Sequence, residues 1–162
     1  LEVVRNKLDG IANEMQQTLL RSSFSPIVKE GLDASASLFT AAVETLAQAC
    51  AIPGHLGTLI PVVAKILELF PVAKMKAGDA FIMNEPYHGG THLPDIAIVT
   101  PIVAKDGRVV AISAAMTHHQ DMGGTSGAAN WRYGKWAGAA VLPPGHRRAP
   151  QHDRQPCGVR DA

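Results

Sequence analysis

Apolar residues recur every three or four positions at the start of the chain, the spacing of an amphipathic helix that runs to about Arg21. The residues on this stripe are Leu1, Val4, Leu8, Ile11, Met15 and Leu19. Residues 22–33 contain Pro26 and favour a loop with one helical turn. A second helical spacing covers residues 57–70, where Pro61 is tolerated because it falls in the first turn. Two amphipathic helices are therefore predicted.

The other apolar segments have the composition of strands. Residues 35–51 favour two short strands, and the run Ala80–Met83 favours a buried strand. β-Branched residues dominate Ile96–Ala104 and Val109–Met116, and Asp106-Gly107 between them signals a tight turn. The expected fold class is α+β, with amphipathic helices packed on a mainly antiparallel sheet that has a central hairpin.

The C-terminal region differs in composition from the rest. From about Ala128 onward the hydrophobic period is lost, and Arg, Pro and Gly become frequent. We expect one folded region over residues 1–128 and an irregular tail over residues 129–162. The abrupt change in composition is what a truncation or an altered reading frame would produce.

Composition and charge exclude several classes of protein. Of the 162 residues, 46% are hydrophobic and 18% are charged, which favours a folded chain over a disordered one. The formal net charge of +1 is not gathered into a basic patch, so no nucleic-acid partner is expected. The apolar stretch 59–70 is too short to span a membrane. Cys50 and Cys157 lack partners at motif spacing, which favours the cytoplasm.

Histidine and aspartate residues gather where the predicted hairpin opens. Asp95 immediately precedes the first strand and His118 follows the second, so antiparallel pairing should make them neighbours. His92 lies on the loop just before Asp95. Two imidazoles and one carboxylate form a ligand set that suits Zn, Mn or Fe and leaves positions open for water or substrate. A metal site is therefore predicted at this end of the hairpin.

The sequence pattern alone does not decide which of the neighbouring polar residues are metal ligands. His119 and Asp121 are either supporting residues or alternative ligands at the same place. Strand alternation sends His118 and His119 to opposite faces, so at most one shares the side of Asp95. A His-x-x-Asp pair by itself is more often a turn hydrogen bond, and it is the second His/Asp cluster that favours a metal or catalytic site.

The remaining candidate residues have simpler interpretations. His55 precedes a helix and is expected to be a cap or packing residue, and His88 is expected to be a loop residue. His146 and His152 receive no role. The glycine cluster at residues 123–127 lacks the lysine of a P-loop, so an ATP site is not expected on this chain.

Four sequence blocks resemble the hydantoinase B/oxoprolinase family in their order and spacing. They are residues 52–57, 78–87, 89–95 and 118–124. The resemblance covers about residues 1–128 and looks like the N-terminal part of a longer subunit. The family includes ATP-dependent 5-oxoprolinases, N-methylhydantoinases and the large subunits of acetone carboxylases. Glu85 stands where an aspartate is commoner in the family.

The resemblance implies roles for individual residues. In the acetone carboxylase relatives, a metal is held by the residues matching His92, Asp95 and His118, which selects His118 over His119 as the ligand. Asp121 or His119 would then orient a ligand or move a proton. The resemblance also implies a hydantoinase A-like partner subunit, which binds ATP and phosphorylates a small-molecule substrate.

The function expected from this resemblance is that of a subunit of an ATP-dependent hydrolase, which opens a cyclic amide such as hydantoin or 5-oxoproline. These residues alone are not expected to be active. One alternative is an acetone carboxylase-type subunit with the same metal site. A second, from another class, is a non-catalytic assembly domain whose histidines are packing and turn residues; this alternative predicts no stoichiometric metal.

Overall fold

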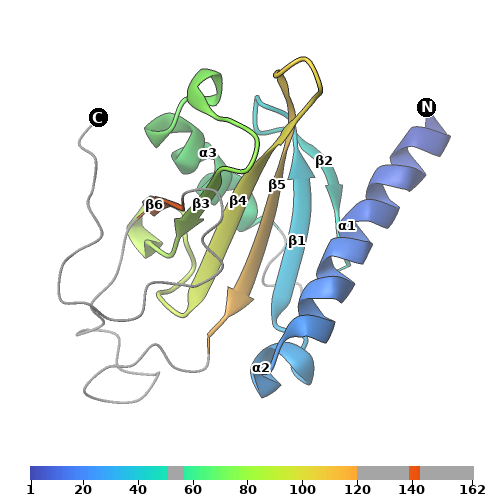
Figure 1. The fold of residues 1–162 in the computed structure, drawn as a ribbon. Helices are drawn as coiled ribbons and strands as arrows, with labels where there is room; N and C mark the ends of the chain where they lie inside the picture. The colour runs from blue at the N-terminus through green and yellow to red at the C-terminus, as the bar shows by residue number, and fades with distance from the viewer. Residues whose placement is uncertain (51–56, 120–138, 143–162) are drawn as a thin grey trace.

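The computed structural model describes residues 1–50, 57–119 and 139–142, and these form an antiparallel sheet with helices packed against it (Figure 1). The strands are β1 (Ala34–Phe39), β2 (Thr45–Gln48), β3 (Ala80–Met83), β4 (Asp95–Val103), β5 (Val109–His118) and β6 (Ala139–Leu142). The helices are α1 (Glu2–Ser22), α2 (Pro26–Lys29) and α3 (Leu59–Leu69), with single turns η2 (Val72–Lys74) and η3 (Pro86–His88). The strand order is β2-β1-β5-β4-β3-β6, and every adjacent pair is antiparallel. The α+β prediction is confirmed.

The two long helices cover opposite faces of the sheet. Successive side chains of a strand alternate between its faces. Ala36 and Leu38 of β1 pack with α1, whereas Phe39 belongs to the cluster packed against α3. That second cluster is the main core, and its fully buried members include Val63 and Ile66 of α3. The α3 face therefore holds the larger cluster of buried apolar side chains.

The buried face of α1 differs from the predicted stripe. Leu8, Met15 and Leu19 do contact the apolar clusters, but Leu1, Val4 and Ile11 are exposed. The most buried positions are Ala12, Gln16 and Leu20. Alanine at position 12 lets the helix approach β1 closely, and the buried amide of Gln16 donates a hydrogen bond to the Ala34 carbonyl at 3.2 Å. The side of α1 that faces the sheet is therefore rotated about the helix axis relative to the apolar stripe predicted from the sequence.

The predicted hairpin is present; its first strand begins one residue earlier than expected, and its second strand ends two residues later. β4 begins at Asp95 and β5 ends at His118, so both residues lie within the paired strands and directly opposite each other. Gly107 takes a φ of +85° in the connecting turn, a conformation that favours glycine. The predicted helix over residues 57–70 corresponds to α3, and the strand Ala80–Met83 is found at its predicted bounds.

β6 differs from the expectation of an irregular region over residues 129–162. It pairs with β3 along its whole length, from Ala80 opposite Leu142 to Met83 opposite Ala139. A four-residue apolar run is too short to show a clear period, and only pairing with an open sheet edge gives it a structure. The rest of that region lies outside the described residues.

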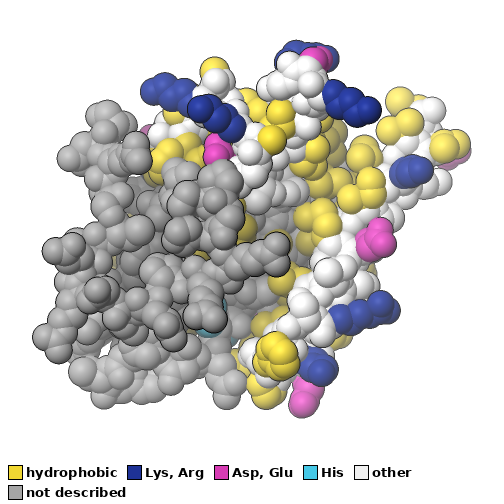
Figure 2. Space-filling model, in the orientation of Figure 1, with side chains coloured by type: hydrophobic (Ala, Val, Ile, Leu, Met, Phe, Trp, Pro, Cys, Tyr) yellow, Lys and Arg dark blue, Asp and Glu magenta, His cyan; other side chains and the backbone are white. Residues whose placement is uncertain are grey.

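The face of the sheet beside α1 carries exposed apolar side chains. Figure 2 shows hydrophobic side chains gathered next to α1, while charged side chains lie on the helix surface and around the hairpin turn. Ile98 and Ile102 of β4 are among the exposed large apolar residues. Within the described part of the chain, no helix is both long enough and apolar enough to cross a membrane.

Candidate metal centre

The hairpin places Asp95 and His118 at the end of the row of side chains that forms the main core. Asp95 pairs with His118, and the next residues on the same face, Ala97 and Met116, pair with each other. Ala97 and Met116 are both fully buried in the cluster packed on α3. The two polar side chains therefore continue an apolar row on the face of the sheet that packs against α3.

The loop between β3 and β4 is tied together by its own polar groups. The Asn84 side-chain amide donates to the Leu93 carbonyl at 3.1 Å, which joins the two ends of the loop. The Glu85 carboxylate accepts from the Tyr87 amide at 3.2 Å, and the Glu85 carbonyl accepts from the Gly90 amide at 3.1 Å. These bonds hold the loop in a compact form beside the hairpin, and Glu85 is used as a cap within it.

A glycine seats this loop against helix α3. Gly89 has a φ of +103°, and a Cβ added there would lie 2.7 Å from the Pro61 carbonyl carbon. Pro61 belongs to the first turn of α3. Because Gly89 has no side chain, the loop backbone can rest directly on the helix. His92 follows three residues later in this loop and lies at the open end of the hairpin.

His92, Asp95 and His118 converge as the sequence predicts. One potential ligand atom from each lies within 4.8 Å of the others. His92 Nε2 is 3.0 Å from Asp95 Oδ1, and the two imidazole rings meet edge to face with centroids 4.9 Å apart. The Asp95 side chain is 3% exposed and that of His92 is 51% exposed. A buried carboxylate is thus bordered on one side by an imidazole that reaches solvent.

The polar atoms of this cluster suit a bound cation. Asp95 Oδ2 accepts a hydrogen bond from the Thr91 hydroxyl, but buried Oδ1 accepts none, although His92 Nε2 lies 3.0 Å from it. His118 Nδ1 is also buried without a hydrogen-bond partner. Buried polar atoms nearly always have partners. Donors about 2.0–2.2 Å from one ion lie within about 4.4 Å of each other, so small side-chain rotations would bring all three to one ion.

His119 is placed apart from the trio. Its backbone amide donates to the Pro94 carbonyl at 2.8 Å, and its side chain is exposed and is not a member of the cluster. Although more than a third of its surface meets solvent, burial of the remainder, and then the nearby His118, lower the pKa of His119 below its ordinary value. Asp121, the other predicted catalytic residue, lies outside the described residues, as do His55 and the glycine cluster 123–127.

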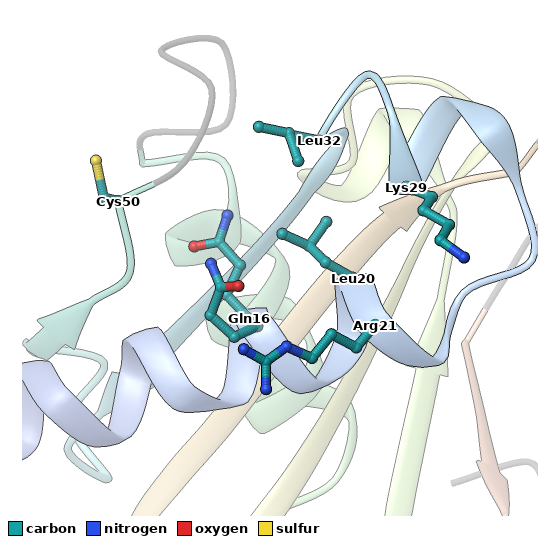
Figure 3. A pocket seen from close by; sticks show the side chains of 7 residues that line it. Gln16, Leu20, Arg21, Lys29, Leu32 and Cys50 are labelled. Carbon is teal, nitrogen blue, oxygen red and sulfur yellow. The ribbon is translucent and has the colours of Figure 1, made fainter.

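A separate hollow of about 550 Å³ lies where α1 meets α2 (Figure 3). Its lining residues are Gln16, Gln17, Leu20, Arg21, Lys29, Leu32 and Cys50. None of the predicted ligands lines it. The chemistry that the sequence predicts is therefore concentrated at the open end of the hairpin.

Two supporting residues of the site were not identifiable from sequence patterns. Thr91 bonds the Asp95 carboxylate, and Asn84 bonds the loop carbonyl of Leu93. The spacing of Thr91, four residues before Asp95, is a weak signal because threonine is common in loops. The seating of Gly89 on Pro61 joins segments that are remote in sequence, and no local pattern reports such a contact.

Comparison with known proteins identifies the family. The model of the hydantoinase B/oxoprolinase family matches residues 1–133. The chain therefore belongs to the hydantoinase B/oxoprolinase family, as its four sequence blocks indicate. A similar protein is the 5-oxoprolinase of Saccharomyces cerevisiae, 37% identical over 124 residues, which are 76% of this chain and 10% of that protein. The chain thus spans about a tenth of the length of the first curated relatives it matches.

Two solved structures share the fold. A nucleotide-free acetone carboxylase matches with a TM-score of 0.66 and 25% identity, covering 76% of this chain and 17% of that one. An ATP-dependent caprolactamase from Pseudomonas jessenii matches with a TM-score of 0.64 and 25% identity, covering 76% of this chain and 21% of that one. The chain is therefore similar both to an enzyme named for a cyclic amide and to one named for a ketone.

Proposed function

We propose that this chain carries the metal site of a subunit of an ATP-dependent cyclic-amide hydrolase. The observation that supports the proposal is the convergence of His92, Asp95 and His118 at the end of the hairpin, with buried donor atoms that lack hydrogen-bond partners. Similar proteins named 5-oxoprolinase and caprolactamase bear the names of cyclic amides. The proposed reaction is therefore the opening of a hydantoin, 5-oxoproline or related ring.

The three side chains have complementary tasks in this proposal. A bound Zn, Mn or Fe ion supplies a Lewis acid for a carbonyl oxygen or a water molecule. Asp95 brings a negative charge whose attraction for a cation is strong because the carboxylate is buried. His92 and His118 add neutral donors, and three protein ligands leave positions open. Half-exposed His92 lies on the side from which substrate would enter.

The remaining steps are assigned to other groups. Asp121 or His119 is proposed to orient a ligand or move a proton, and the lowered pKa of His119 keeps its imidazole neutral and able to accept one. ATP is assigned to a hydantoinase A-like partner subunit that activates the substrate by phosphorylation. A cytoplasmic location, and residues 1–128 as the family-like region, belong to the same proposal.

Metal binding tests the site directly. The purified chain, equilibrated with Zn or Mn and freed of excess ion, is expected to hold about one equivalent by elemental mass spectrometry. His118→Ala should weaken binding by more than about 100-fold, because removing a ligand costs more than removing the support of one. His119→Ala is the matched control, since the neighbouring imidazole is not in the cluster. Circular dichroism checks that both variants fold.

Two outcomes would contradict this assignment. Loss of binding in His119→Ala with retention in His118→Ala would move the ligand role to the other imidazole. Absence of stoichiometric metal from the wild-type chain would favour the assembly domain, in which the histidines are packing and turn residues.

The carboxylase alternative is supported by the match to acetone carboxylase, whose TM-score is close to that of the caprolactamase. The complex purified with its ATP-binding partner separates the two reactions. ATP-dependent formation of a ring-opened product from 5-oxoproline or hydantoin is expected. Consumption of acetone and bicarbonate with ATP, and no ring opening, would assign the site to carboxylation instead.

A further inference from the structure

We propose that Thr91 is a positioning residue that assigns different tasks to the two oxygens of Asp95. The Thr91 hydroxyl holds Oδ2 by a hydrogen bond, which reserves Oδ1 for the metal ion. This inference rests on the proposed metal site and adds to it the residue that sets how the carboxylate binds. Asp95 is accordingly a ligand through one oxygen.

The contacts of the carboxylate support this division. Oδ2 accepts from Thr91, whereas Oδ1 faces His92 Nε2 at 3.0 Å and is buried without a hydrogen-bond donor. Asp95 is only 4% exposed, so solvent has little access to replace the bond to Oδ2. The protein thus satisfies one oxygen internally and leaves the other directed toward the donor atoms of the trio.

The position of Thr91 in the chain suits this task. It lies at the end of the loop that rests on α3 and immediately precedes His92. The Asp95 backbone amide donates to the His92 carbonyl at 3.0 Å, which closes the turn between them. The hydrogen bond from the Thr91 hydroxyl to the Asp95 side chain closes the same turn a second time. It therefore holds the loop that carries His92 against the start of β4, which carries Asp95.

Loss of the Thr91 hydroxyl would allow the Asp95 carboxylate to rotate about its terminal χ angle. The terminal χ angle of an aspartate has a broad, two-fold energy profile and needs a partner to hold it in one orientation. Without Thr91, the Asp95 carboxylate can rotate to offer both oxygens to an ion or to turn Oδ1 away from it. Groups that orient metal ligands in this way are worth about 10- to 100-fold in metal affinity.

Two substitutions of Thr91 distinguish the effect of its hydroxyl from the effect of its side-chain shape. Thr91→Val keeps the branched side chain and removes the hydroxyl, while Thr91→Ser keeps the hydroxyl. Thr100→Val is the matched control, because the Thr100 hydroxyl lies 2.6 Å from Ser113 Oγ within the same hairpin but outside the trio. Metal affinity is measured by competition with a chromophoric chelator. Infrared spectra of protein with 13C-labelled aspartate report whether a carboxylate binds through one oxygen or two.

The expected result is a roughly 10- to 100-fold weaker affinity in Thr91→Val, near-wild-type affinity in Thr91→Ser and no change in Thr100→Val. The infrared splitting of the metal-bound carboxylate should narrow in Thr91→Val as the second oxygen becomes a ligand. If Thr91→Val does not fold, Thr91→Ala, which is smaller and also lacks the hydroxyl, replaces it in the same comparison.

Failure of this inference is distinguishable from failure of the proposed function. If the wild-type chain binds one equivalent of metal and Thr91→Val binds it equally well with an unchanged carboxylate band, the role of Thr91 is overturned and the metal site stands. Equal weakening in Thr91→Val and Thr100→Val would also overturn it, because the effect would be general. If the wild-type chain binds no metal, the site itself fails, and the role of Thr91 fails with it.

Discussion

Replacing Gly89 with alanine tests whether the seating of the loop on α3 maintains the candidate metal centre. The added Cβ would lie 2.7 Å from the Pro61 carbonyl carbon and 2.9 Å from its oxygen. Optimal carbon–carbon contact is about 3.5 Å, so the loop or the first turn of α3 must move by roughly 0.8 Å. Because the added Cβ would meet the backbone of Pro61 and the Cβ of its rigid ring, no flexible side chain can absorb the shift.

The cost has two parts that can be measured separately. A non-glycine residue at positive φ costs about 1–2 kcal/mol, and overpacking costs a further 1–3 kcal/mol. Gly107→Ala is the matched control, because Gly107 has a φ of +85° and no atom within 4 Å of an added Cβ. Gly89→Ala should thus lower the free energy of unfolding by about 2–5 kcal/mol, against about 1–2 kcal/mol for Gly107→Ala.

Urea unfolding of the metal-free proteins measures the two free energies, and metal titration of the same samples measures the effect on the site. Gly89 lies three residues before His92, so its displacement should weaken metal binding at least 10-fold, as loss of ligand support does. Gly107→Ala should bind like wild type. Equal losses of stability in the two variants, with equal metal affinities, would show that the contact with Pro61 does not position the loop.

Three further predictions concern the core and the response to pH. Ile66→Ala removes a fully buried side chain and should cost about 2–5 kcal/mol in urea unfolding, while exposed Ile60→Ala should cost far less; similar losses would contradict the assigned core. Burial and the nearby His118 lower the pKa of His119, so the native chain binds fewer protons than the unfolded chain as the pH falls below about 6.5. The free energy of unfolding should therefore decrease from about pH 7 to pH 5. His119→Gln should reduce that slope, and an unchanged slope would refute this cause. Imidazole ligands must be neutral, so metal affinity measured by titration should weaken as the pH falls, and pH-independent binding would exclude imidazole ligands.

The pairing across the candidate metal centre could be read from the sequence because it depends on local rules. The Asp106-Gly107 signal sets the position of the turn, and antiparallel strands that leave a turn return beside each other. Asp95 and His118 are opposite each other for this reason. The register shift between Ile102 and Val103, close to the turn, does not prevent that pairing.

Other features depended on contacts that no local pattern encodes. The period of α1 predicts an apolar stripe, but which side of the helix is buried follows from how closely Ala12 approaches β1 and from the bond that Gln16 makes to Ala34. β6 exists as a strand only because β3 offers it an unpaired edge.

The candidate metal centre shows the same division within a single site. Periodicity and a turn signal depend on residues close together in the chain, and they were sufficient to predict that Asp95 lies beside His118. The choice between His118 and His119 by resemblance agrees with the observed cluster, although metal binding itself stays a prediction. The seating of Gly89 and the bond from Thr91 to one oxygen of Asp95 require the loop, a helix and the hairpin to be packed together, so they could be found only after the chain was folded.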